Sequence, residues 1–82
     1  MHQIARTPKQ LGAIIRRARK AAGMSQAMLG EKAGIWQETV SRIESGQGGT
    51  RIDTILDILA ALKLEIEVGP RSNVAGSIED IF

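Results

Sequence analysis

Apolar residues recur at helical spacing in the first quarter of the chain. Thr7 followed by Pro8 suits the start of a helix, because threonine caps free backbone N–H groups and proline fits the first turn. Gly23 suits the left-handed residue that often ends a helix. We therefore predict a helix from Pro8 to about residue 22. Its apolar stripe consists of Leu11, Ile14, Ile15, Ala18 and Ala22.

Two shorter helices are predicted next, with a glycine turn between them. Ser25 caps the first, which covers Gln26 to about Ala33 and ends at Gly34. The second covers about Gln37 to Ser45 and ends at Gly46. A helix this short and polar is unstable alone, so it must be held by packing. The inward positions of the pair are Leu29, Val40 and Ile43.

A fourth helix and a short strand follow the glycine-rich loop 46–49. Residues 50–53 resemble a capping box with Asp53 in place of glutamate, and Lys63 ends the helix. Residues 64–68 alternate apolar and acidic side chains, which is typical of a half-buried strand. A lone strand is marginal in water, so we expect it to pair with the same strand of a second copy. The apolar helix positions are Ile52, Ile55, Leu56, Leu59 and Leu62, and the dimerising strand positions are Leu64, Ile66 and Val68.

The predicted fold class is all-α with one added strand. Four helices fill a domain over residues 1–63, the dimerisation strand occupies 64–69, and a tail covers 70–82. The tail ends in Phe82, the only phenylalanine, and is a candidate partner-binding segment. At 82 residues the chain is small for a domain, and a second copy would add buried surface.

The composition argues against an enzyme and against a metal site. The chain has no cysteine and one histidine, His2, which stands near the N-terminus. Neither a metal ligand set nor a catalytic triad can be assembled from these residues, and no cofactor is expected. There is no apolar run of membrane-spanning length and no apolar N-terminal signal segment. We therefore expect a cytoplasmic, nucleoid-associated protein without a membrane partner.

The charges of the two parts of the chain differ in sign. Residues 1–51 hold nine of the eleven Lys and Arg residues but only three of the nine acidic ones. Residues 52–82 hold the other two basic residues and six acidic ones, so this part is net negative. Such asymmetry favours a polyanion-binding region joined to a region with another role, and the alternative is ordinary solvated surface.

Two short helices around a glycine turn are the pattern of a helix-turn-helix. Gly30 keeps the first helix thin where the second crosses it. The second helix presents polar side chains outward, of a size that reaches base edges in a major groove. These positions are Gln37, Glu38, Ser41 and Arg42, with Thr39 at the edge. Glu38 repels phosphate but can accept a hydrogen bond from cytosine.

Two neighbouring features are candidates for contacts to the DNA backbone. The amides of the loop and the start of the fourth helix are suited to a phosphate, with help from Thr50 and Arg51. Trp36 stands just before the polar helix. It either stacks on a sugar-phosphate edge or packs on the body as a hydrophobic staple.

The segment 25–46, SQAMLGEKAGIWQETVSRIESG, resembles the Xre/Cro family of phage-repressor-like DNA-binding domains over roughly residues 8–62. The resemblance implies that Gln26 contacts a phosphate and braces Gln37. It also implies base reading by the polar positions given above, with Thr39 nearer the backbone. A structural ion pair between Arg19 and Glu44 is a further implication. Trp36 departs from the family, where a small capping residue is usual.

The strand directly after the fourth helix is similar to that of HipB-type antitoxins. This resemblance implies a homodimeric repressor that binds an inverted-repeat operator in double-stranded DNA. It also implies a HipA-like Ser/Thr kinase toxin as partner, which the acidic second part and the tail would contact. The alternatives are a stand-alone repressor without a toxin, and a protein-interaction module in which the polar helix docks a partner.

Overall fold

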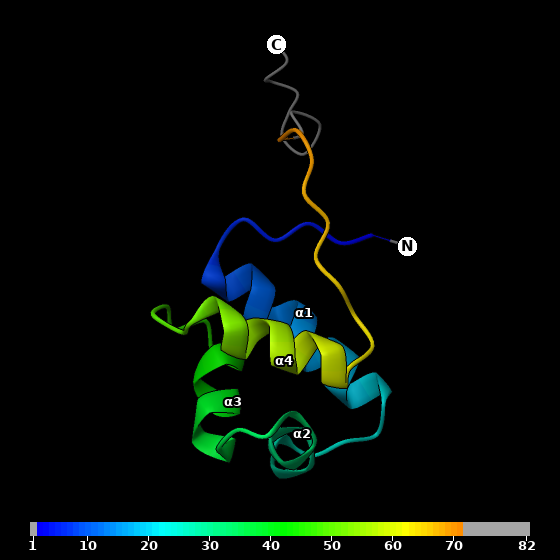
Figure 1. Ribbon diagram of the computed structural model, residues 1–82, viewed down its shortest axis with the longest axis vertical. Helices are drawn as coiled ribbons and strands as arrows, with labels where there is room; N and C mark the ends of the chain where they lie inside the picture. The colour runs from blue at the N-terminus through cyan, green and yellow to red at the C-terminus, as the bar shows by residue number, and fades with distance from the viewer. Residues whose placement is uncertain (1, 72–82) are drawn as a thin grey trace.

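The computed structural model describes residues 2–71, so most of the predicted tail, residues 72–82, lies outside the described part. The described chain is all-helical, as predicted (Figure 1). Its four helices are α1 (Pro8–Ala21), α2 (Gln26–Ala33), α3 (Gln37–Glu44) and α4 (Ile52–Ala61). No helix of this part is long and apolar enough to cross a membrane.

The predicted caps of the first two helices are confirmed. The Thr7 hydroxyl accepts a hydrogen bond from the Gln10 amide at 3.0 Å, and the Ser25 hydroxyl accepts one from the Met28 amide at 3.1 Å. Gly34 ends α2 in the left-handed conformation, with φ of 77°. Each bond satisfies a backbone donor that the helix itself leaves unpaired.

The predicted capping box of α4 is wrong. The N-cap residue is Arg51, and its side chain makes no capping hydrogen bond. The Asp53 carboxylate instead accepts from the Thr54 amide and pairs with Arg51 at 3.1 Å. At the other end Lys63 has a φ of 61°, which turns the chain away from the helix without a glycine.

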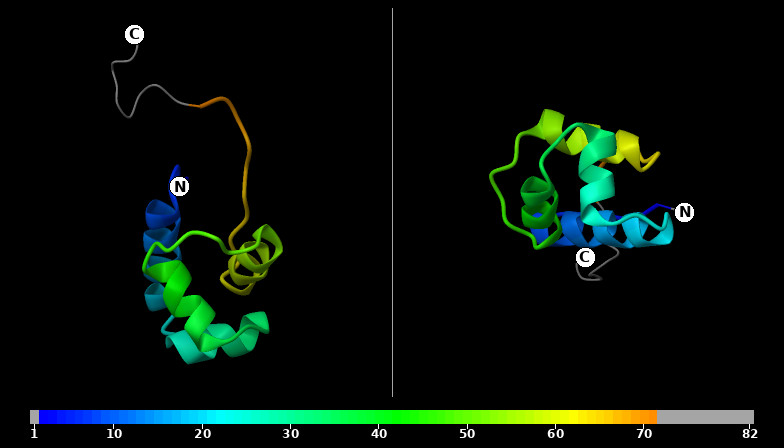
Figure 2. Two further views of the ribbon diagram at one scale, coloured as in Figure 1. Left: turned by 90° about the vertical axis from the view of Figure 1, so that its left-hand side faces the viewer. Right: turned by 90° about the horizontal axis from the view of Figure 1, so that it is seen from below.

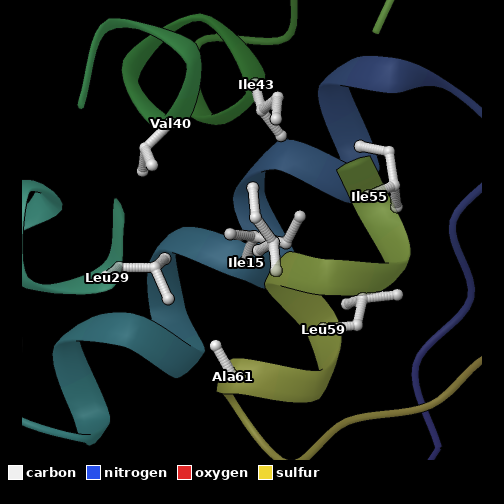
Figure 3. Close-up of a cluster of buried hydrophobic side chains, with 8 residues drawn as sticks. Ile15, Leu29, Val40, Ile43, Ile55, Leu59 and Ala61 are labelled. Carbon is white, nitrogen blue, oxygen red and sulfur yellow. The ribbon is translucent and has the colours of Figure 1, made fainter. Parts of the chain in front are cut away.

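The core lies where all four helices meet (Figure 3). Its buried members are Ile15, Leu29, Val40, Ile43, Ile55, Ile58, Leu59 and Ala61. The predicted stripe of α4 is partly wrong, because Ile52 and Leu56 are exposed whereas Ile58 is fully buried. Ile58 lies in the core that the four helices share, whereas the side of α4 that carries Ile52 and Leu56 faces solvent.

Two glycines allow helices to approach closely. A Cβ atom on Gly30 would lie 2.8 Å from the Ile35 carbonyl oxygen at the turn between α2 and α3. A Cβ atom on Gly12, in the middle of α1, would overlap the carbonyl oxygen of Ile43 in α3. The role of Gly30 was predicted from its position, whereas that of Gly12 was not.

The chain after α4 runs beside the N-terminal arm, residues 2–6, on the side away from α2 and α3 (Figures 1 and 2). A groove of about 500 Å³ lies between the two segments. His2 and Glu67 meet across it at 2.9 Å, both largely exposed. Residues 64–68, for which a strand is predicted, form no strand in the single described chain.

Candidate nucleic-acid interface

Helix α3 presents a continuous polar surface to solvent. Gln37, Glu38, Ser41 and Arg42 are all exposed, and Thr39 is half-buried at the edge of this face. Val40, Ile43 and Glu44 are buried on the opposite face. The helix therefore has one face held by packing and one free for a ligand, as its pattern predicts.

The turn between α2 and α3 fixes the angle of this surface. The Ile35 amide donates to the Gly30 carbonyl at 2.8 Å, and the left-handed Gly34 reverses the chain just before it. Because Gly30 has no side chain, the first residue of α3 sits directly against α2. Helix α3 is thereby fixed as a rigid unit on α2.

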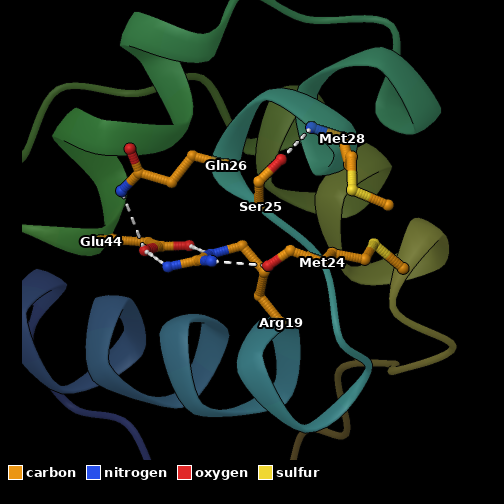
Figure 4. A network of polar contacts seen from close by, with 6 residues as sticks. All are labelled: Arg19, Met24, Ser25, Gln26, Met28 and Glu44. Carbon is orange, nitrogen blue, oxygen red and sulfur yellow. Dashed lines mark hydrogen bonds and ion pairs between the residues drawn. The ribbon is translucent and has the colours of Figure 1, made fainter.

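A buried polar network ties the far end of α3 to α1 and α2 (Figure 4). The Arg19 guanidinium donates to both carboxylate oxygens of Glu44, from Nε at 2.7 Å and from Nη2 at 3.0 Å. Its remaining nitrogen donates to the Met24 carbonyl at 2.7 Å. Both side chains are almost fully buried, with 9% and 2% of their surface exposed. The resemblance implies this ion pair, whereas the Met24 carbonyl was not foreseen.

The network keeps Glu44 ionised. Burial of its carboxyl acts to raise the pKa, but hydrogen bonds from Arg19 and Gln26 and the charges of Arg19 and Arg16 outweigh it. The net effect is a lowered pKa for Glu44. The hydrogen bonds to Glu44 likewise raise the pKa of Arg19. The pair is therefore fully charged at neutral pH.

Gln26 stands at the start of α2, next to this network. Its side-chain amide donates to Glu44 at 3.2 Å. The bracing of Gln37 that the resemblance implies stays a prediction. The bond turns the amide toward the C-terminal end of α3. Gln26 thus links the starting turn of α2 to the buried ion pair.

The remaining predicted backbone contacts lie at the edges of this surface. Trp36 is 79% exposed, so the alternative that packs it on the body as a staple is wrong. It precedes α3 without a side-chain cap. Thr50 is half-buried, and the exposed Arg51 is engaged with Asp53, whose pKa this hydrogen bond lowers. Among residues 2–71 no group of acidic or histidine side chains gathers as metal ligands would.

Sequence reasoning missed the contact that sets the distance between α1 and α3. Gly12 lies against the backbone of Ile43 and Glu44, and it is buried. The only signal was a glycine inside a helical stripe, which costs about 1 kcal/mol relative to alanine and so indicates a packing reason.

The helical architecture and its turn match a known family. The protein-family model HTH_3, described as Helix-turn-helix, matches residues 15–68, which is more than half of the chain. The chain belongs to this helix-turn-helix family. This confirms the resemblance to Xre-like DNA-binding domains.

Two curated members of the helix-turn-helix class are similar in sequence. Antitoxin HipB of Escherichia coli is 30% identical over 69 residues, which cover 84% of this chain and 78% of HipB. An uncharacterized HTH-type transcriptional regulator of Sinorhizobium fredii is 37% identical over 57 residues. That match covers 70% of this chain but 29% of the regulator. The chain is thus a helix-turn-helix regulator related to HipB.

Solved structures of the helix-turn-helix family show the same arrangement. HipB in the HipA-HipB-O2-O3 complex has a TM-score of 0.79 at 30% identity, covering 87% of this chain and all of HipB. A HipB variant in complex with the 20mer O2 has a TM-score of 0.80 at 30% identity, covering 88% of this chain and all of that one. The restriction-modification controller protein C.AhdI of Aeromonas hydrophila has a TM-score of 0.66 at 31% identity, covering 71% of this chain and 84% of C.AhdI.

Proposed function

We propose that this protein is a sequence-specific DNA-binding repressor and the antitoxin of a HipBA-like toxin–antitoxin module. It represses its own operon in the cytoplasm and binds a HipA-like Ser/Thr kinase toxin. The observation that carries the proposal is the extent of the likeness to HipB. It covers 87% of this chain and the whole HipB chain, whereas the likeness to C.AhdI covers 71% of this chain.

Helix α3 enters the major groove of the operator. The side chains on its exposed face that contact base edges are Gln37, Glu38, Ser41 and Arg42. Arg42 is suited to a bidentate contact with guanine, and Glu38 can accept a hydrogen bond from cytosine. Thr39 and Gln26 lie nearer the backbone. Trp36 stacks on a sugar-phosphate edge, which its exposure favours.

The loop before α4 holds a further phosphate. Thr50 and the backbone amides at the start of α4 are the donors, and Arg51 assists through its exposed guanidinium. The exposed pair with Asp53 is weak enough to exchange for a phosphate, because such surface pairs contribute little.

Two copies dimerise through residues 64–68. Ile66 is 47% and Val68 is 95% exposed in the single chain, and the backbone of this segment has no ladder partner among residues 2–71. Pairing with a second copy would satisfy that backbone and cover the apolar side chains. The segment lies on the side away from α3, so both copies of α3 stay free (Figure 1). They would then reach successive major grooves, about 34 Å apart, on an inverted repeat.

The Arg42→Ala variant tests base reading by α3. We expect it to weaken binding to the upstream DNA of the native operon by about 1–3 kcal/mol, or roughly tenfold to hundredfold, with little effect on random duplex. Fluorescence anisotropy with a labelled duplex measures both. Arg17→Ala is the matched control, because Arg17 points to the N-terminal arm, where it donates to Gln3. Unchanged operator affinity in Arg42→Ala would remove Arg42 from the reading surface.

The Ile66→Asp variant tests dimerisation. A carboxylate in the apolar row of the paired strand would be buried unpaired, so we expect monomers in sedimentation at concentrations where the native chain is dimeric. Glu65→Gln, one position away on the opposite face, should leave the dimer intact. A dimer that survives Ile66→Asp places the interface elsewhere.

The toxin partner separates the antitoxin from a stand-alone repressor. Co-purification of the chain expressed from its native operon should recover a HipA-like kinase in a stable complex. A stand-alone repressor binds the operator but brings no kinase with it. A protein-interaction module would leave the upstream DNA unshifted in a mobility-shift assay even at low salt.

A further inference from the structure

Three basic side chains share one face of α1. Lys9, Arg16 and Lys20 are seven and four residues apart, which places them in one row along the helix. All three residues are exposed, and within residues 2–71 none of their side chains forms a hydrogen bond or an ion pair. We refer to Lys9, Arg16 and Lys20 as the α1 basic face.

The N-terminal part of the α1 basic face lies beside the C-terminal end of α3. Gly12, one turn before Arg16, packs against the Ile43 and Glu44 carbonyls at the end of α3, and Lys9 packs against Gly46 just beyond it. The charge of Arg16 reaches Glu44 and helps to lower its pKa. The left view of Figure 2, which looks onto α3, shows α1 alongside it.

No ion pair within residues 2–71 involves the α1 basic face. Glu44, the acidic residue that packs against α1, is neutralised by the buried Arg19. Arg17, the residue after Arg16, points away from this face and donates to Gln3 of the N-terminal arm at 2.8 Å. The basic side chains of α1 therefore point in different directions, and the row that begins at Lys9 starts beside the end of α3.

The geometry assigns the α1 basic face to the backbone of operator DNA, where its side chains bind phosphates beside the major groove that α3 enters. This inference rests on the proposed DNA binding and extends its footprint. Lysine and arginine side chains are suited to phosphate oxygens, and their long stems reach across a few ångströms of solvent. Such contacts position the protein and add affinity on any sequence.

The double variant Arg16→Gln/Lys20→Gln tests the assignment against the matched control Arg17→Gln. Anisotropy titrations are run on the upstream DNA and on a random duplex of equal length, from 50 to about 200 mM salt. We expect the slope of log affinity against log salt to become shallower by about 1 for each phosphate contact removed. Both duplexes should weaken by the same factor, whereas Arg17→Gln should keep the native slope.

Three further measurements decide the outcome. A double variant with the native salt slope overturns the assignment, as does one that weakens the operator while leaving the random duplex unchanged. Thermal melting should give the native midpoint, and Arg16→Lys/Lys20→Arg should restore the slope, because only charge is needed. Native protein that ignores both duplexes at low salt overturns the proposed DNA binding itself, and so is distinct from a failure of this face.

Discussion

Replacing Arg19 by Met should lower the free energy of unfolding by about 3 kcal/mol or more. The variant leaves the Glu44 carboxylate buried with only the Gln26 amide as a partner, and 2% of the Glu44 side chain is exposed. An uncompensated buried charge is among the few changes that cost this much. Urea unfolding followed by circular dichroism, at one fixed protein concentration, measures the loss.

The double variant Arg19→Met/Glu44→Leu separates the buried charge from lost packing. Replacing both partners by apolar groups removes the unpaired carboxylate, so most of the stability should return. If the double variant is as unstable as Arg19→Met alone, the loss comes from the Met24 carbonyl or from packing, not from Glu44.

At acidic pH the difference in free energy of unfolding between the native chain and Arg19→Met should become smaller. The pKa of Glu44 is lower in the folded chain than its ordinary value of 4.5, so its contribution is complete above that value. It is lost as the pH falls from about 4.5 through the lowered pKa of the folded state. In Arg19→Met, acidification instead neutralises a carboxylate that burial disfavours. If the difference in free energy of unfolding between the two proteins stays constant down to about pH 3, this account is wrong.

The second large effect is expected at Gly12. An alanine there would place its Cβ atom into the carbonyl oxygen of Ile43 and 2.9 Å from that of Glu44. Backbone atoms cannot move aside as a flexible side chain does, so α1 and α3 must separate. We expect Gly12→Ala to cost about 2–3 kcal/mol in the same urea assay, despite alanine's better helix propensity.

Gly48→Ala is the control for this substitution. An added Cβ atom at Gly48 meets only Pro8, at 3.6 Å, which is ordinary contact. We expect a change within about 0.5 kcal/mol. If Gly12→Ala is as mild as Gly48→Ala, α1 and α3 are not held at the distance that their packing implies.

Much of the local structure follows from residues close together in the chain. Thr7 and Ser25 start helices because a hydroxyl can bond an amide three residues later, and Gly34 ends one because it accepts a positive φ. The polar face of α3 is equally predictable, because helical periodicity places its residues on one side. The prediction of a capping box at α4 is wrong because the Asp53 carboxylate accepts hydrogen bonds from Arg51 and from the Thr54 amide instead.

The sequence by itself therefore determined the four helices, their order and the outward face of α3, since caps and periodicity act within one element. Only the tertiary structure decided which of these faces are covered. Three features depend on how the helices cross. They are the contact of Gly12 with α3, the exposure of Ile52, and the hydrogen bond from the Gln26 amide to Glu44. The same crossing places Lys9 against Gly46, just beyond the end of α3. Contacts between residues far apart in the chain carry no signature in local spacing, because they exist only once the helices have packed.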